Sequence, residues 1–200
     1  MTYRTDLNFC KELIKSGSHS FYAASKLLPA KVRNPALILY AFCRLADDAI
    51  DDSSCKQKSF LKLNRRLELV YKGKPLDTPY DRAFTNMVEK FQLPKTLPQA
   101  LLEGMKWDAE GRQYENLSDL KSYSARVASA VGVMMCVIMG ARNKHVLARA
   151  CDLGVAMQLT NIARDIGEDA REGRIYIPLD WFEELEITQR EFCEEPYAGP

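Results

Sequence analysis

The sequence predicts an all-α fold, and three observations support that prediction. Good helix formers dominate the chain, alternating runs of β-branched residues are almost absent, and glycine (10) and proline (9) are few among 200 residues. The prolines lie where helices are expected to end. With 46% hydrophobic and 28% charged residues, the chain can bury a substantial core. We therefore expect one helical domain over residues 1–200.

The helices are expected in chain order at residues 6–16, 19–28, 34–52, 57–72, 78–91, 96–113, 118–141 and 144–169, before a loop and a short helix from about residue 179. Asn34 before Pro35 is typical of a capping residue followed by a first-turn proline, and Ser118 is expected to cap its helix. The apolar stretch 127–140 is too short for a transmembrane helix of ~20 residues. It predicts either a helix buried on all sides or the wall of an apolar channel.

Composition excludes several classes of function. The net charge is +1 and no basic tract is present, so the chain is not expected to bind nucleic acid. Six cysteines occur without a CxxC pair, and only two histidines are available, which argues against a zinc site. The scattered thiols and the absence of a secretory pattern after Met1 indicate a reduced, cytoplasmic protein.

Two pairs of carboxylates carry the clearest functional signal. Asp47 and Asp51 form the first acid pair, and Asp165 and Asp169 form the second. Residues four apart on a helix differ by only ~40° in projection and lie ~6 Å apart, so each pair points at one location. A single pair of this kind is most often solvated surface. Two pairs facing each other across a helical cavity would instead hold hard divalent cations, and these would hold phosphate oxygens.

The neighbours of the two acid pairs favour a cavity over an ordinary solvated surface. The first pair shares a helix face with Tyr40 and Arg44, and the second shares one with Asn161 and Gln158. Both helices are otherwise largely apolar. Because a polar stripe on such a helix must face water or a polar cavity, we interpret both stripes as facing one cavity.

Arginines lie close to both acid pairs. Arg44 precedes the first pair, and Arg164 and Arg174 flank the second. Guanidinium groups suit phosphate oxygens, although surface ion pairs with neighbouring acids are the alternative interpretation. Gly173 and Pro178 predict that the segment after the second pair is a loop or lid.

These motifs together resemble those of the squalene and phytoene synthases. Residues 153–178, LGVAMQLTNIARDIGEDAREGRIYIP, are similar to one signature of that family, and residues 123–138, YSARVASAVGVMMCVI, are similar to another. Residues 40–51 resemble its first aspartate-rich helix, and residues 18–21 resemble its amino-terminal motif. The likeness is strongest to the bacterial members that form phytoene. It implies an isoprenoid-synthase-type helical bundle with a central cavity, here without the C-terminal helices of the longer relatives.

The resemblance implies head-to-head condensation of two geranylgeranyl diphosphates to phytoene through a cyclopropyl (prephytoene) diphosphate. Diphosphate is released, and the pathway is carotenoid biosynthesis. The implied cofactor is Mg²⁺, or Mn²⁺ in its place, held by Asp47, Asp51, Asn161, Asp165 and Asp169. The implied catalytic residues are Tyr40, Arg44, Asp47, Asp51, Tyr123, Asp165 and Asp169. The implied substrate-binding residues are Ser18, His19, Ser20, Phe21, Arg44, Ala128, Val131, Gly132, Gln158, Asn161, Arg164, Arg174 and Tyr176.

Some of these residues have a second interpretation from the sequence alone. Ser18, His19 and Ser20 could touch a diphosphate, as the resemblance implies, or could be a helix cap beside a buried histidine. Phe21 and Tyr176 could close over the site or could belong to the core.

Two other functions are alternatives to phytoene synthesis. One is a squalene-type or presqualene-type synthase that uses farnesyl diphosphate; its reductive form would need NADPH, for which the chain has no glycine-rich fingerprint. The other is a non-catalytic assembly or scaffold relative, which retention of both acid pairs disfavours. Prenyl diphosphates are the expected partners. Their lipophilic tails point to peripheral association with the inner face of the membrane and to contacts with other carotenoid-pathway enzymes.

Overall fold

The computed structural model describes residues 2–51 and 56–194, except the side chains of Thr2 and Asp51. Every regular element in these ranges is helical, which confirms the predicted all-α fold. The helices are α1 (Thr2–Gly17), α2 (His19–Ser25), α3 (Ala30–Asp51), α4 (Lys56–Tyr71), α5 (Pro79–Phe91), α6 (Thr96–Ala109), α7 (Leu117–Ser124), the π-helical turn η1 (Ala125–Ser129), α8 (Ala130–Ile138), α9 (Lys144–Arg171), α10 (Leu179–Glu184) and α11 (Gln189–Glu194).

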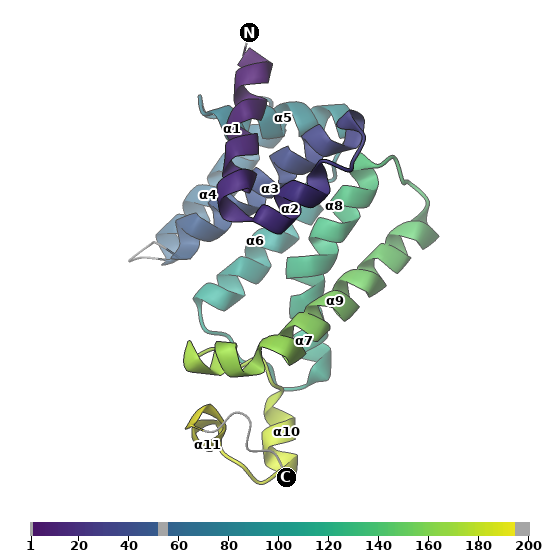
Figure 1. The fold of residues 1–200 in the computed structure, drawn as a ribbon. Helices are drawn as coiled ribbons and strands as arrows, with labels where there is room; N and C mark the ends of the chain where they lie inside the picture. The colour runs from purple at the N-terminus through teal and green to yellow at the C-terminus, as the bar shows by residue number, and fades with distance from the viewer. Residues whose placement is uncertain (1, 52–55, 195–200) are drawn as a thin grey trace.

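The helices form one bundle with a long axis (Figure 1). The bundle is built from α1 to α6 at the amino-terminal end, α8 and α9 run along its length, and α10 and α11 lie at the opposite end. The main core is aliphatic and lies between α3, α5, α6 and α8; Ile38, Leu39, Leu102 and Met134 are among its most buried side chains. Among the described helices, none has the length and apolarity needed to cross a membrane.

Helix α3 begins earlier than the sequence predicted. The carbonyl of Pro29 accepts the N–H groups of Val32 and Arg33 at 2.9 and 2.8 Å, so the helix is established from Ala30. The predicted cap at Asn34 is therefore wrong, and Pro35 lies inside the helix. Pro35 has no N–H to donate to the carbonyl of Lys31, so it removes one backbone hydrogen bond in the second turn of the helix.

The single helix predicted over 118–141 is divided into α7, η1 and α8. Its amino-terminal cap is Asn116, whose side chain accepts the N–H groups of Ser118 and Asp119 at 2.9 and 3.1 Å; the predicted cap at Ser118 is wrong. The π-helical turn η1 then shifts the helical register between α7 and α8. Such turns mark places where packing overrides the regular i→i−4 pattern.

Two glycines allow η1 to pack closely between α6 and α9. A Cβ added at Gly104 of α6 would lie 2.6 Å from Val127 Cγ1, and one added at Gly154 of α9 would lie 2.5 Å from Ser129 Cα. The Ser129 hydroxyl also donates to the Cys151 carbonyl of α9 at 2.6 Å. Because real Cβ atoms cannot approach this closely, glycine at these two positions sets the spacing of the three elements.

We predict that Gly154→Ala destabilises the protein by ~1–3 kcal/mol, even though alanine is the better helix former. The added methyl meets backbone atoms of Ser129, which cannot rotate away. The matched control is Gly132→Ala in α8, where the nearest atom is the Ala150 carbonyl oxygen at 3.7 Å. Chemical denaturation should show the control unchanged or stabilised by up to ~1 kcal/mol. Equal effects of the two substitutions would contradict the packing account.

Candidate active site

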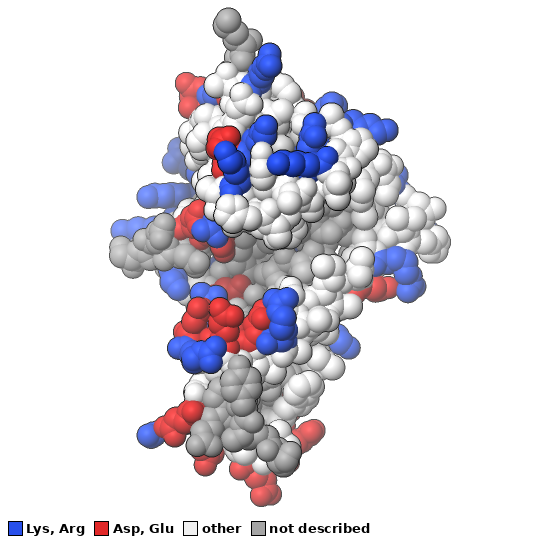
Figure 2. Space-filling model, in the orientation of Figure 1, with Lys and Arg blue, Asp and Glu red and all other residues white. Residues whose placement is uncertain are grey.

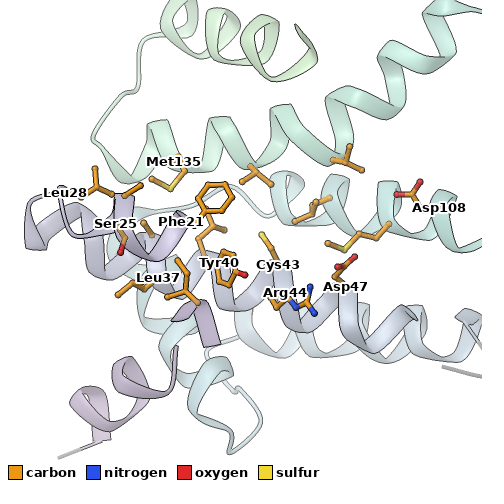
Figure 3. Close-up of a pocket in the computed structure, with 18 residues that line it drawn as sticks. Phe21, Ser25, Leu28, Leu37, Tyr40, Cys43, Arg44, Asp47, Asp108 and Met135 are labelled. Atoms are coloured by element: carbon orange, nitrogen blue, oxygen red, sulfur yellow. The ribbon is translucent and has the colours of Figure 1, made fainter. Parts of the chain in front are cut away.

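A cavity of about 620 Å³ lies between α2, α3, α6 and the η1–α8 segment (Figure 3). Its volume falls within the usual ~300–1,000 Å³ of small-molecule sites. Most of its lining is apolar, while Arg44, Asp47 and Asp108 lie at one end and Leu28 and Met135 lie toward the other. The cavity therefore offers an apolar chamber with a charged end.

One face of the apolar stretch 127–140 forms a wall of this cavity. Val127, Val131 and Met135 are spaced by four residues and line it together. Val133 and Met134, on other faces of α8, are buried in the aliphatic core. Both interpretations that the sequence left open therefore apply, each to a different face of the same helix.

Helix α3 supplies the largest share of the lining. Tyr40, Cys43 and Asp47 recur at helical spacing and face the cavity, with Arg44 beside them. The Arg44 guanidinium is paired with Asp48 at 2.9 Å. Gly17, at the end of α1, lies so close to Tyr40 that a Cβ there would be 2.5 Å from the Tyr40 hydroxyl oxygen. The end of α1 thus fixes this tyrosine, and burial raises its pKa, which keeps the hydroxyl neutral.

Asp108 lies at the charged end of the cavity, and the sequence analysis did not identify it. It follows Leu101 and Met105 at helical spacing on α6, and all three line the cavity. The signal that could have revealed it is a carboxylate on the apolar face of a helix, which requires hydrogen bonds or a cation. Both carboxylate oxygens are bonded: Tyr123 donates to Oδ2 at 2.7 Å, and Tyr176 donates to Oδ1 at 3.0 Å.

The two tyrosines that hold Asp108 belong to a stacked aromatic cluster. The rings of Tyr114, Tyr123 and Tyr176 have centroids 5.2–6.3 Å apart. Ile162 of α9 packs against the same cluster, so the cluster joins α7 and α9 to the loop that follows α9. Burial raises the pKa of Tyr123 far above its ordinary value and that of Tyr176 to about 12. Both phenols are therefore neutral hydrogen-bond donors at neutral pH.

Opposing effects act on the pKa of Asp108. Burial is the largest effect and raises it, while the two tyrosine hydroxyls and the nearby Arg174 lower it, and Asp47 raises it again. The net result is a raised pKa. Asp47 of the first acid pair is thus within electrostatic reach of Asp108, as is Arg174 from the loop after α9.

The second acid pair lies on the last turns of α9, outside the lining of the large cavity. Asp165 accepts two hydrogen bonds from Arg164, at 2.7 and 2.6 Å, and they hold its pKa below the usual value. The pKa of Asp169 is raised, first by burial and then by the charge of Asp165. Arg174 acts on Asp169 as well as on Asp108, so it links the two carboxylates. Figure 2 shows acidic and basic side chains gathered over this end of α9.

The structure brings some of the predicted residues together at the cavity and places the others elsewhere. Those that line it are Phe21, Tyr40, Arg44, Asp47 and Val131. Tyr123 and Tyr176 adjoin it through Asp108. Those that do not line it are Ser18, His19, Ser20, Ala128, Gly132, Gln158, Asn161, Arg164, Asp165, Asp169 and Arg174. The side chain of Asp51 lies outside the described residues.

The amino-terminal motif has the geometry of a helix cap. The Ser18 hydroxyl accepts the N–H of Phe21 at 3.3 Å and caps α2, while the hydroxyls of Ser18 and Ser20 lie 3.3 Å apart. His19 is exposed, so the interpretation as a buried histidine is wrong. Phe21 is 65% exposed and lines the cavity, which excludes simple core packing for this ring.

Among the side chains that the structure describes, which do not include that of Asp51, no three His, Cys, Asp or Glu are grouped so that they could hold a metal ion by themselves. The oxygen donors of both acid pairs are nevertheless the kind that Mg²⁺ prefers. Magnesium is usually bound through one or two carboxylates together with phosphate oxygens of a substrate rather than by a cage of protein ligands. The donor set therefore fits a metal that binds jointly with a phosphorylated ligand.

The sequence matches one known protein family over most of its length. The squalene/phytoene synthase family model matches residues 14–199. The chain belongs to the squalene/phytoene synthase family.

Individual relatives agree with this assignment. A phytoene synthase of Rhodobacter capsulatus is 57% identical over 98% of this chain and 59% of its own length. A 15-cis-phytoene synthase of a Paracoccus species is 41% identical over 86% of this chain and 60% of its own length. The crystal structure of a dehydrosqualene synthase in complex with ligand matches with a TM-score of 0.86 at 34% identity, over 96% of this chain and 68% of that one. The crystal structure of a squalene synthase from Alicyclobacillus acidocaldarius matches with a TM-score of 0.90 at 26% identity, over 98% of this chain and 74% of that one. The chain thus spans about three-fifths of the length of the two phytoene synthases.

We predict that the stability contributed by Asp108 decreases as pH rises. Because its pKa is raised on folding, the folded protein binds this proton more tightly than the unfolded chain. The difference in free energy of unfolding between wild type and Asp108→Asn should fall as pH rises from about 3.9 through the raised pKa, and stay constant above it. Denaturant titrations across this range measure that difference.

Tyr176→Phe provides the second arm of this test. It removes a hydrogen bond that lowers the Asp108 pKa, so the fall should extend to higher pH in that background. Carbon-13 NMR of the Asp108 carboxyl group reports the same change directly. An unshifted titration in Tyr176→Phe, or a stability difference that rises with pH, would contradict the account.

Proposed function

We propose that the protein is a prenyltransferase that condenses two geranylgeranyl diphosphates head to head to form phytoene, in carotenoid biosynthesis. One observation carries the proposal: an apolar cavity of about 620 Å³ ends at the carboxylates Asp47 and Asp108. A long apolar tail fits the chamber, and a diphosphate fits the charged end. The names of the Rhodobacter and Paracoccus relatives support the choice of product.

Both acid pairs, with Asn161, are proposed to hold Mg²⁺ together with the substrate diphosphate. When bound, the metal supplies positive charge that stabilises diphosphate as a leaving group. Binding of the metal would also relieve the repulsion that raises the pKa of Asp169 beside Asp165. Mn²⁺, which accepts the same oxygen ligands, is expected to substitute.

The chain's own residues are proposed to bind and orient the substrates. Arg44 and Arg174 would contact diphosphate oxygens through their guanidinium groups. The Tyr40 ring lies in the cavity wall, where its face can stabilise an allylic cation once the first diphosphate has left. Tyr123 and Tyr176 hold Asp108 by hydrogen bonds and so fix the charged end. The wall formed by Val127, Val131 and Met135 would exclude water from the cation.

The proposed reaction has two stages. Loss of diphosphate from the first substrate leaves an allylic cation, which the double bond of the second substrate attacks. Loss of a proton then gives the cyclopropyl diphosphate. In the second stage that diphosphate leaves, the ring rearranges, and loss of another proton gives the conjugated triene of phytoene.

We propose a cytoplasmic protein that associates peripherally with the inner face of the membrane, since the substrate tails and the product are lipophilic. Other enzymes of the carotenoid pathway are proposed partners for the same reason.

We predict that Asp165→Asn lowers turnover of geranylgeranyl diphosphate by about 10²–10³-fold, because one carboxylate is lost from the metal-diphosphate site. The control is Asp152→Asn, which lies on the same helix but is exposed and paired with Arg149. Purified protein is incubated with Mg²⁺ and labelled substrate without NADPH, and the hydrocarbons are separated by chromatography. Wild type and the control should give phytoene that disappears with EDTA. Preference for farnesyl diphosphate would instead favour a squalene-type synthase.

Binding is measured beside turnover, because the chain spans about three-fifths of the length of the two phytoene synthases. The unreactive thio analogue of geranylgeranyl diphosphate should bind in calorimetry only when Mg²⁺ is present, and Asp165→Asn should weaken that binding. Metal-independent binding, or equal binding by both aspartate variants, would reject the assignment of the acid pairs.

A further prediction concerns the length of the tail. Val131→Phe adds bulk to the cavity wall and should shift the ratio of geranylgeranyl to farnesyl analogue binding toward the shorter chain by about tenfold or more. Met139→Phe is the control, because Met139 is exposed at the end of the same helix. An unchanged ratio in Val131→Phe would remove the cavity as the tail site.

A further inference from the structure

A second cavity, of about 340 Å³, lies between α1, α2 and the first turns of α3. Its charged lining consists of Lys11 from α1, Lys26 from the end of α2 and Arg33 from α3. No Asp or Glu is among the described residues that line it. The neutral polar side chains in its lining are Asn8, Tyr22, Ser25 and Asn34. The cavity therefore offers hydrogen-bond donors and positive charge without a compensating acid.

The three cations are also without acidic partners in the part of the chain that the structure describes. None of them is in an ion pair there. Lys26 is held instead over the ring of Tyr22, with Nζ 4.5 Å from the ring centre. The whole chain has 28 basic and 27 acidic residues, so the excess of cations here is not a property of the whole chain. Like charges gathered in this way repel one another, and a bound anion would remove the repulsion.

The basic character extends beyond this cavity. A neighbouring cavity shares Asn34 and is lined by Lys31 and Lys90, again with no acid among its described lining residues. Figure 2 shows several Lys and Arg side chains on the face formed by α1, α2 and the start of α3, with a few acidic side chains among them. The two neighbouring cavities, which have no acid among their described lining residues, therefore form one region that attracts anions.

An exposed apolar side chain lies next to the basic cavity in the chain. Leu27 follows Lys26 directly and is 88% exposed. Ser25 and Leu37 line both the basic cavity and the large apolar cavity, so the two share a wall. Apolar side chains beside a cluster of basic ones are the combination that binds the interface of an anionic membrane.

We propose that the cavity lined by Lys11, Lys26 and Arg33 is a phosphate-binding site, filled by the headgroup of an anionic phospholipid or by a soluble phosphate ester. Guanidinium and ammonium groups form charge-assisted hydrogen bonds with phosphate oxygens, and the Asn34 amide adds a neutral donor. The exposed Leu27 favours the phospholipid. The site is distinct from the charged end of the large cavity, whose lining includes two carboxylates.

The test uses glycerol 3-phosphate as the soluble probe and two kinds of vesicle, phosphatidylcholine alone or mixed with phosphatidylglycerol. The soluble probe should shift the NMR signals of Lys11, Lys26 and Arg33, and the protein should sediment with the anionic vesicles only. The double variant Lys11→Gln/Arg33→Gln should weaken binding at least about tenfold. The control Lys58→Gln/Lys62→Gln removes the same charge from exposed positions on α4 and should bind as wild type does.

Leu27→Ser distinguishes the two sources of phosphate. Loss of vesicle binding with retained binding of glycerol 3-phosphate identifies the phospholipid headgroup. Binding of glycerol 3-phosphate without any vesicle binding by wild type identifies a soluble ester. The proposal is overturned if neither probe binds, or if the double variant and the α4 control lose binding equally, which would show only non-specific attraction to the overall charge.

Discussion

The arrangement of the site depends on the close packing of the π-helical turn η1 between α6 and α9. Gly104 leaves no room for a Cβ against the Val127 side chain, and Gly154 leaves none against the Ser129 backbone, so the three elements meet at close range. Val127 lines the large cavity from this turn, and Ile162 of α9 packs against the tyrosine cluster. A larger separation between these elements would move the acid pair of α9, Asp165 and Asp169, away from the charged end of the cavity.

The charged end of the large cavity brings together carboxylates for which burial and mutual repulsion are each unfavourable. Asp108 is removed from water, which raises its pKa, and two neutral tyrosine hydroxyls partly compensate for the lost hydration. Burial and the charge of Asp165 raise the pKa of Asp169, while the charge of Arg174 lowers the pKa of both Asp108 and Asp169. Carboxylates that repel one another next to an apolar chamber are the environment in which a cation with a phosphate ligand gains most. In the second cavity, the cluster of Lys11, Lys26 and Arg33 has the opposite requirement and would be stabilised by an anion.

The helical fold could be predicted from the sequence because helix formers and prolines act locally, and α9 (Lys144–Arg171) falls almost where its periodicity placed it. The starts of two helices were not predicted correctly from the sequence. The Pro29 carbonyl and the Asn116 side chain, and not Asn34 and Ser118, accept the first N–H groups of these helices. The π-helical turn depends on contacts between distant segments, which local propensity does not report. For the site, spacing identified Asp47, Tyr40 and Arg44, whereas Asp108 is a lone acid whose partners, Tyr123 and Tyr176, are 15 and 68 residues away.

The acid pairs of α3 and α9 are proposed to form one metal-diphosphate site beside Asp108, at the end of the apolar cavity. Paramagnetic relaxation can locate this site, with Mn²⁺ and inorganic diphosphate added to isotopically labelled protein. If one site joins the two helices, the backbone signals of Asp47, Asp108 and Asp169 should broaden selectively, with α4 and α5 unaffected. Broadening confined to one acidic helix, or centred on exposed acids such as Asp77 and Asp152, would contradict it.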